Sequence, residues 1–246
     1  MNEILERHRC VGSMGSEFWR IEVPPEIVPS LAAEFDWNRM GRRVMIDAAK
    51  GIISWMSPSS AHETLADAAD ETVKAAARRS GGRARAMRGT RWKGPEDPRN
   101  TGLEADASFY IGANAERWYA ALDEGGAAAA EAFEAATPPD LAVEVEVTRF
   151  DVDKPGRYAA LGVREMWRAA SRDGGNRVEV EILDLRSPGE PRSAAESAAI
   201  PGLKAALLPE AFDLARRGRF EKLEELLAAV LEPAPAPINT PYFTQT

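Results

Sequence analysis

The stretch LAVEVEVT, residues 141–148, is the most regular pattern in the chain and predicts a β-strand. Side chains alternate across a strand, so the valines at 143, 145 and 147 share one face, whereas Glu144 and Glu146 share the other. The two carboxylates then lie roughly 7 Å apart. Magnesium takes oxygen ligands from one or two carboxylates and completes its shell with water or phosphate. The pattern leaves two interpretations open: a half-exposed strand with a solvated face, or one wall of a cation site.

Short apolar runs and helical patterns on both sides of this strand predict one α/β domain with a central sheet. Before it we expect a hairpin of residues 43–47 and 52–56, a helix over 61–79 ended by Gly81-Gly82, an extended segment over 83–93, a loop over 94–103, a strand over 105–111 and a helix over 114–134 that Gly125-Gly126 interrupts. After it we expect a helix over 153–161 ended by Gly162, strands over 164–170 and 177–186 joined by a turn at 173–176, a polar loop over 187–200 and a helix over 210–231.

The ends of the chain differ from this patterned region. Residues 1–40 are weakly patterned and interrupted by prolines, and we interpret them as an N-terminal extension. The proline-rich residues 233–246 predict a flexible, disordered tail. The predicted domain therefore covers residues 41–232.

Composition excludes several classes of protein. Of the 246 residues, 39 are acidic and 31 are basic, and the net charge of -8 excludes a uniformly basic coat for nucleic acid. The single cysteine, Cys10, excludes an intramolecular disulfide framework and a zinc site built on several cysteines. No apolar run approaches the ~20 residues that span a bilayer. We expect a cytoplasmic protein that does not enter a membrane.

Three further charged residues are candidates for chemistry, and each has a simpler interpretation. Asp106 begins the strand over 105–111, where an aspartate also suits a turn. Lys154 starts a helix eight residues after Glu146, where its ammonium can lean over the carboxylates or simply face solvent. Glu63 lies three residues after Ser60, and this spacing already fits a capping box. His62 receives no catalytic role.

The stretch from Pro138 to Arg168 resembles a large bacterial family of "putative restriction endonucleases" in the PD-(D/E)XK nuclease superfamily. The matching motifs are PDL at 139–141, Glu144, Lys154, YAALGV at 158–163, Glu165 and Trp167, together with GLEADASFYI at 102–111, MSPSSAHE at 56–63 and SAAIPGL at 197–203. The resemblance covers roughly residues 40 to 210. It implies a restriction-endonuclease-like fold, in which helices flank a central mixed sheet.

The resemblance also implies a site and an activity. Asp106 matches the first aspartate of the superfamily motif and Glu144 the second acid, and both would bind Mg²⁺ or Mn²⁺, with Glu146 as a further ligand. Position 146 is the usual place of the catalytic lysine, which Lys154 would supply here, and Glu63 would match an acid from the first helix. Ala105 replaces the usual proline, and Pro155-Gly156 directly after Lys154 can shift the aim of the lysine. The implied reaction is metal-dependent hydrolysis of phosphodiester bonds in nucleic acid, with DNA as the expected substrate.

A run of bases offers a surface for nucleic acid despite the acidic balance. No acid interrupts residues 72–95, and the candidates for phosphate contact are Arg78, Arg79, Arg83, Arg85, Arg88, Arg91 and Lys93. The simpler alternative is a solvated strand face. Two other functions stay open: a catalytically silent nuclease-fold module that binds nucleic acid or a protein, and a structural protein whose aromatic side chains pack a dimer. We expect a homodimer in the enzymatic case, because cutting two strands suits two sites.

Overall fold

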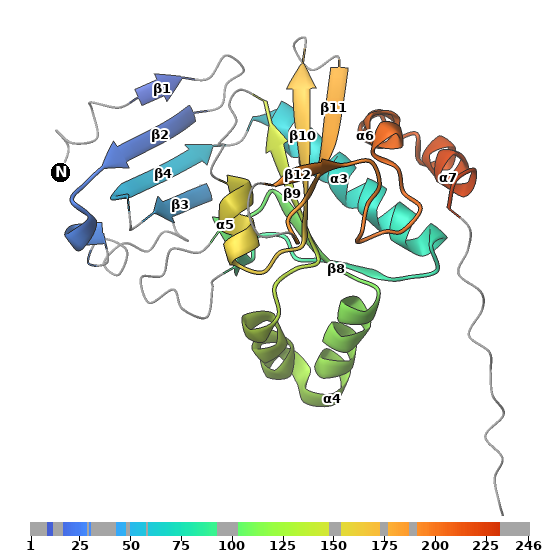
Figure 1. Ribbon diagram of the computed structural model, residues 1–246, viewed down its shortest axis with the longest axis horizontal. Helices are drawn as coiled ribbons and strands as arrows, with labels where there is room; N and C mark the ends of the chain where they lie inside the picture. Colours follow the sequence, from blue (N-terminus) through green and yellow to red (C-terminus); the bar gives the residue numbers. More distant parts are fainter. Residues whose placement is uncertain are drawn as a thin grey trace, which may run out of the picture.

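The computed structural model describes residues 9–11, 17–28, 30, 43–47, 50–57, 59–92, 103–147, 154–172, 177–186 and 191–231 (Figure 1). The strands are β1 (Arg9–Val11), β2 (Glu17–Glu22), β3 (Arg43–Asp47), β4 (Ile52–Ser57), β5 (Ala84–Ala86), β6 (Arg91–Trp92), β7 (Leu103–Glu104), β8 (Ala107–Ile111), β9 (Leu141–Glu146), β10 (Glu165–Arg172), β11 (Arg177–Asp184) and β12 (Arg192–Ala194). The helices are α3 (Ser60–Arg79), α4 (Ala113–Ala136), α5 (Lys154–Ala160), α6 (Leu208–Arg216) and α7 (Phe220–Ala228), with 3-10 turns η2 (Pro25–Ile27) and η5 (Ala205–Leu207).

A six-stranded mixed sheet forms the centre of the molecule, in the order β12-β11-β10-β9-β8-β5. Strands β9 and β10 are parallel, and helix α5 lies in the connection between them, as a parallel pair requires. The other pairs in this sheet are antiparallel. The predicted α/β fold, with helices flanking a central mixed sheet, is confirmed.

Helices cover both faces of β9, which explains why this strand is buried almost throughout. On one face, Val143 and Val145 join a core that also contains α3, α6 and α7. On the other face, Ala142 packs with Tyr158 of α5 and with Met166 of β10. The half-exposed interpretation of the 141–148 strand is therefore wrong for Glu144, of which only 2% is exposed.

A second, antiparallel sheet with the order β1-β2-β4-β3 lies beside the first (Figure 1). Its β3–β4 pair is the predicted hairpin around Lys50-Gly51. Strands β1 and β2 come from the first forty residues, and β2 pairs with β4. The division into an extension, a domain and a tail stays a prediction. The 233–246 tail, most of the 94–103 loop and the 173–176 turn lie outside the described residues.

Two predictions about helix boundaries were wrong. The capping residue of α3 is Ser59, not Ser60, because the Ser59 hydroxyl accepts a hydrogen bond from the backbone N–H of His62. The predicted helix over 210–231 is two helices, α6 and α7, separated at Gly218. Gly218 has a φ of 67°, a left-handed conformation that ends α6 and that glycine adopts without strain.

Two smaller features complete the fold. Helix α4 contains non-helical backbone at Gly126, so the interruption predicted at Gly125-Gly126 is confirmed, and α4 folds back on itself as a helical hairpin (Figure 1). The region predicted as a polar loop over 187–200 contains the edge strand β12, which pairs with β11.

Candidate active site

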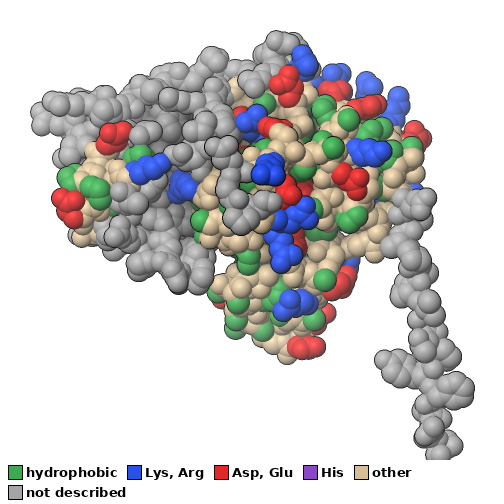
Figure 2. Space-filling model, viewed as in Figure 1, with side chains coloured by type: hydrophobic (Ala, Val, Ile, Leu, Met, Phe, Trp, Pro, Cys, Tyr) green, Lys and Arg blue, Asp and Glu red, His purple; other side chains and the backbone are tan. Residues whose placement is uncertain are grey.

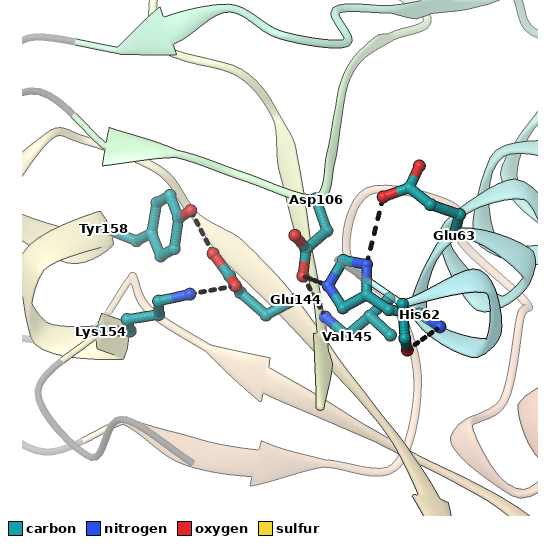
Figure 3. Close-up of polar contacts among 8 residues, drawn as sticks. His62, Glu63, Asp106, Glu144, Val145, Lys154 and Tyr158 are labelled. Carbon is teal, nitrogen blue, oxygen red and sulfur yellow. Dashed lines mark hydrogen bonds and ion pairs between the residues drawn. The ribbon is translucent and has the colours of Figure 1, made fainter. Parts of the chain in front are cut away.

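The carboxylate of Glu144 lies in the middle of the sheet and is held on both of its oxygens. Tyr158 donates its hydroxyl hydrogen to Oε1 at 2.5 Å. The ammonium of Lys154 donates to Oε2 and forms an ion pair with it. Figure 3 shows both partners reaching Glu144 from α5. A nearly inaccessible carboxylate thus has a compensating positive charge and a hydroxyl donor, which a buried charge requires.

Helix α5 places these two partners by its period. Residues 154 and 158 are four apart, so their side chains lie on one face of the helix. Pro155 occupies the first turn, where a missing N–H leaves no hydrogen bond unmade. The Pro155-Gly156 pair does not turn Lys154 away from the carboxylates, which was the concern raised by the sequence.

Asp106 lies in the bend between β7 and β8, one residue before β8, so it does not begin the strand as the sequence predicted. Ala107 pairs with Val143, so the residue before β8 comes beside the second half of β9. The Oδ2 atom of Asp106 accepts a hydrogen bond from the backbone N–H of Val145 at 2.6 Å. Only 5% of Asp106 is exposed. Figure 3 shows the Asp106 carboxylate between Glu144 and His62, with one oxygen in contact with His62 of α3, whereas the carboxylate of Glu144 is directed toward α5.

His62 is one of two residues of this site, together with Tyr158, to which the sequence analysis gave no role. Its Nε2 lies 3.2 Å from Oδ2 of Asp106, and its Nδ1 lies 3.4 Å from Oε1 of Glu63. The imidazole side chain is 4% exposed, so it is enclosed between two carboxylates (Figure 3). The spacing of apolar residues along α3 could have indicated that His62 is buried. His62 precedes Leu65 by three residues and Ala69 by seven, which puts it on the buried face of α3.

Glu63 is not the capping residue that the sequence analysis assumed. With Ser59 as the cap, Glu63 is the fourth residue of α3, and its side chain is 47% exposed. It reaches the site through its contact with His62. Its predicted role in catalysis stays a prediction.

Glu146 follows two residues after Glu144 on β9 and is partly exposed at the end of the strand. Among the residues that the structure describes, no group of three or more histidine, cysteine, aspartate or glutamate side chains is placed to hold a metal ion. The carboxylates of Glu144 on β9 and of Asp106 just before β8 nevertheless fit magnesium by the chemistry of the donors, because this ion uses one or two carboxylates and fills its remaining positions with water. The metal roles of Asp106, Glu144 and Glu146 stay predictions.

Burial also determines the protonation state of Tyr158. The phenol is completely buried and faces the charge of Glu144, and both effects raise its pKa well above the ordinary value. Tyr158 is therefore a hydrogen-bond donor to Glu144 across the physiological pH range and cannot act as a general base.

The predicted nucleic-acid residues are partly engaged within the protein. Arg78 pairs with Glu224 at 2.9 Å, and Arg88 pairs with Asp67 at 2.8 Å. Arg83 stacks on a tyrosine ring and Arg85 on a tryptophan ring. Over much of the face seen in Figure 2, basic side chains are interspersed with acidic ones. Lys93 lies outside the described residues, and the phosphate-binding role of this run stays a prediction.

Two other motif acids have structural partners at the opposite end of the sheet. Asp140 accepts hydrogen bonds from Ile111 N and Asn114 Nδ2, at 2.8 and 2.7 Å. Glu165 accepts from the indole of Trp167 at 2.7 Å and from the hydroxyl of Ser197 at 2.6 Å. Leu141 and Glu165 are paired at the start of two parallel strands, whereas Glu144 lies further along β9. The family motif therefore contains two kinds of residue: those of the candidate site, such as Glu144, and those that hold the sheet together through hydrogen bonds, such as Asp140 and Glu165.

Comparison with known families agrees with the resemblance noted in the sequence. The sequence profile of the Uma2 family, described as "Putative restriction endonuclease", matches residues 32–207. The chain therefore belongs to this family. A search of curated proteins found no match. None of the helices in the described part of the chain has the length and apolar character needed to cross a membrane.

Proposed function

We propose that this protein is an endonuclease that hydrolyses phosphodiester bonds of DNA with the help of Mg²⁺ or Mn²⁺. The observation that carries the proposal is the contact between Lys154 and the buried Glu144, with Asp106 directly before β8, the strand that pairs with β9. A carboxylate pair with an adjacent lysine is the arrangement that metal-assisted phosphoryl chemistry uses. The same three residues match the family motif in order.

In this proposal Asp106, Glu144 and Glu146 hold the divalent cation, which supplies Lewis acidity toward the phosphodiester and toward the attacking water. Lys154 orients the water and offsets negative charge that develops on the phosphoryl oxygens. The backbone N–H of Val145 and the imidazole of His62 hold Asp106 in position. Glu63, partly exposed and in contact with His62, is available to orient a water molecule at the edge of the site.

Cleavage of supercoiled plasmid and of single-stranded DNA, with Mg²⁺ or Mn²⁺, tests the proposal. We expect Asp106→Asn, Glu144→Gln and Lys154→Met to abolish the cleavage shown by the wild type. Asp184→Asn is the matched control, because Asp184 pairs with Arg186 outside the site. Equal cleavage by the wild type and all three site variants would remove the assignment.

One observation favours a second candidate, a catalytically silent module that binds nucleic acid or a protein. Both oxygens of Glu144 are already engaged by side chains of α5. Calorimetric titration with Mn²⁺, for the wild type and Glu144→Ala, separates the two candidates. Metal binding that depends on Glu144 supports the nuclease, whereas equal heats for both proteins support the silent module.

We also propose that the active form is a homodimer, since two sites suit the cutting of two strands. Light scattering after size exclusion measures the mass directly. A monomeric mass at concentrations that support double-strand cleavage would contradict this part of the proposal.

A further inference from the structure

The two side chains of α5 that hold Glu144 differ in how firmly they are fixed. Tyr158 is 0% exposed, whereas the side chain of Lys154 is 25% exposed. The tyrosine has one short, rigid connection to its ring, whereas the lysine ammonium stands on a flexible four-carbon stem. The lysine can therefore move to another partner when a cation takes its place at Glu144, whereas the tyrosine cannot.

The packing around Tyr158 explains its fixed position. Its ring belongs to a core of buried residues from β9, β10 and the segment before β8, including Ala142, Val163 and Met166. The backbone of Tyr158 is also fixed, because Leu161 and Val163 both donate N–H hydrogen bonds, each of 3.1 Å, to the carbonyl of Tyr158. The hydroxyl therefore cannot leave Glu144 without unpacking the junction between α5 and β10.

We infer that Tyr158 is a positioning residue, which keeps Glu144 Oε1 in place while Lys154 moves from Oε2 to the scissile phosphate. Without Tyr158, departure of Lys154 would take away the second of the two side-chain donors of Glu144, and the buried carboxylate would turn toward another donor. With Oε1 held by the hydroxyl, Oε2 stays directed toward whichever cation is present. Lys154 is then available to the reacting phosphate without loss of the carboxylate geometry.

This inference rests on the proposed function, and the substitution Tyr158→Phe tests it. The change removes one oxygen atom and keeps the ring in its core. Tyr110→Phe is the matched control, because Tyr110 is equally buried and donates its hydroxyl to the carbonyl of Thr137 at 2.7 Å, away from Glu144. Two measurements apply to both variants: the affinity for Mn²⁺ by calorimetry, and kcat and KM for cleavage of a DNA oligonucleotide.

We expect Tyr158→Phe to weaken Mn²⁺ binding and to lower kcat by about 10-fold or more, as is typical when a partner of a metal ligand is removed. KM for DNA should stay within about 2-fold, because Tyr158 is buried and does not reach the substrate. Tyr110→Phe should match the wild type in both measurements, although each variant loses one hydrogen bond of a tyrosine hydroxyl.

The possible results distinguish the positioning role of Tyr158 from the proposed nuclease function. If wild type binds Mn²⁺ through Glu144 and Tyr158→Phe behaves like Tyr110→Phe, the positioning role is overturned and the nuclease proposal stands. If wild type neither binds Mn²⁺ nor cleaves DNA, the nuclease proposal fails and the inference fails with it. A selective defect in Tyr158→Phe supports both.

Discussion

The substitution Lys154→Met gives the sharpest prediction about the stability of this protein. It keeps the length and most of the volume of the side chain but leaves the carboxylate of Glu144, 2% exposed, without its positive partner. Removing one partner of a buried ion pair costs about 3–5 kcal/mol. Since a quarter of the Lys154 side chain is exposed, water replaces part of the lost interaction. We therefore expect the free energy of unfolding to fall by about 2–3 kcal/mol.

The reciprocal change, Glu144→Gln, should cost less. The amide oxygen still accepts from the Tyr158 hydroxyl, and the Lys154 ammonium can extend into solvent. We expect Glu144→Gln to lower the free energy of unfolding by about 1 kcal/mol. The double variant removes both charges, so it should be more stable than Lys154→Met alone by at least about 1 kcal/mol.

Urea unfolding followed by circular dichroism at neutral pH measures these differences, provided that the slope with urea concentration stays constant. Lys74→Met is the matched control. Lys74 pairs with the mostly buried Asp70 at 2.8 Å, but Arg88 lies 3.3 Å from the same carboxylate and remains in the variant. The free energy of unfolding of Lys74→Met should be less than about 1 kcal/mol below that of the wild type. The reasoning is refuted if Glu144→Gln is as destabilising as Lys154→Met, or if the double variant is no more stable than Lys154→Met.

Three further predictions concern residues around and outside the site. His62→Asn removes the imidazole contact to Asp106 and should lower cleavage by about 10-fold, which single-turnover kinetics measures; unchanged kinetics would show that His62 serves only the packing of α3. Arg186, hydrogen-bonded to Asp184, lowers the pKa of Asp184 to about 2, so this stabilising contribution is present above pH ~4 and is lost as the pH falls through 2. Asp184→Asn should lower the free energy of unfolding by less than about 1 kcal/mol at pH 7, because the pair is partly exposed. In urea unfolding, the difference from wild type should shrink as the pH falls toward and below 2, and an equal difference at pH 7 and pH 2 would contradict the assignment. If the arginines of residues 78–91 contact phosphates, the affinity for DNA should fall steeply with salt concentration in a fluorescence titration, and a salt-independent affinity would exclude them.

The strand at 141–148 was predictable because its alternation reflects a purely local property of the backbone. The same alternation cannot show whether the second face is covered. One of the two interpretations that the sequence left open placed Glu144 on a solvated face, and it is buried because α5 returns over that face from the connection to β10. Burial of a charged residue depends on a distant segment, and no local pattern contains this information.

The arginines of residues 78–91 also show that a sequence pattern does not reveal contacts with distant segments. Their density in the sequence suggested an open positive surface. In the structure Arg78 meets Glu224, which lies 146 residues away, and Arg83 meets Glu116. Charge patterning along the chain records which charges are present, but not which of them neutralise one another after folding.

The sequence by itself determined the order of most strands and helices and the family, and it supplied the five residues proposed for the chemistry, which are Asp106, Glu144, Glu146, Lys154 and Glu63. These follow from local periodicity and from motifs whose residues stand in a recognisable order. Only the tertiary structure decided that His62 lies between Glu63 and Asp106, and that Tyr158 and Lys154 divide the two oxygens of Glu144. Such contacts join α3, β9 and α5 across the sheet, and the packing of these elements sets the distances between the atoms that meet there.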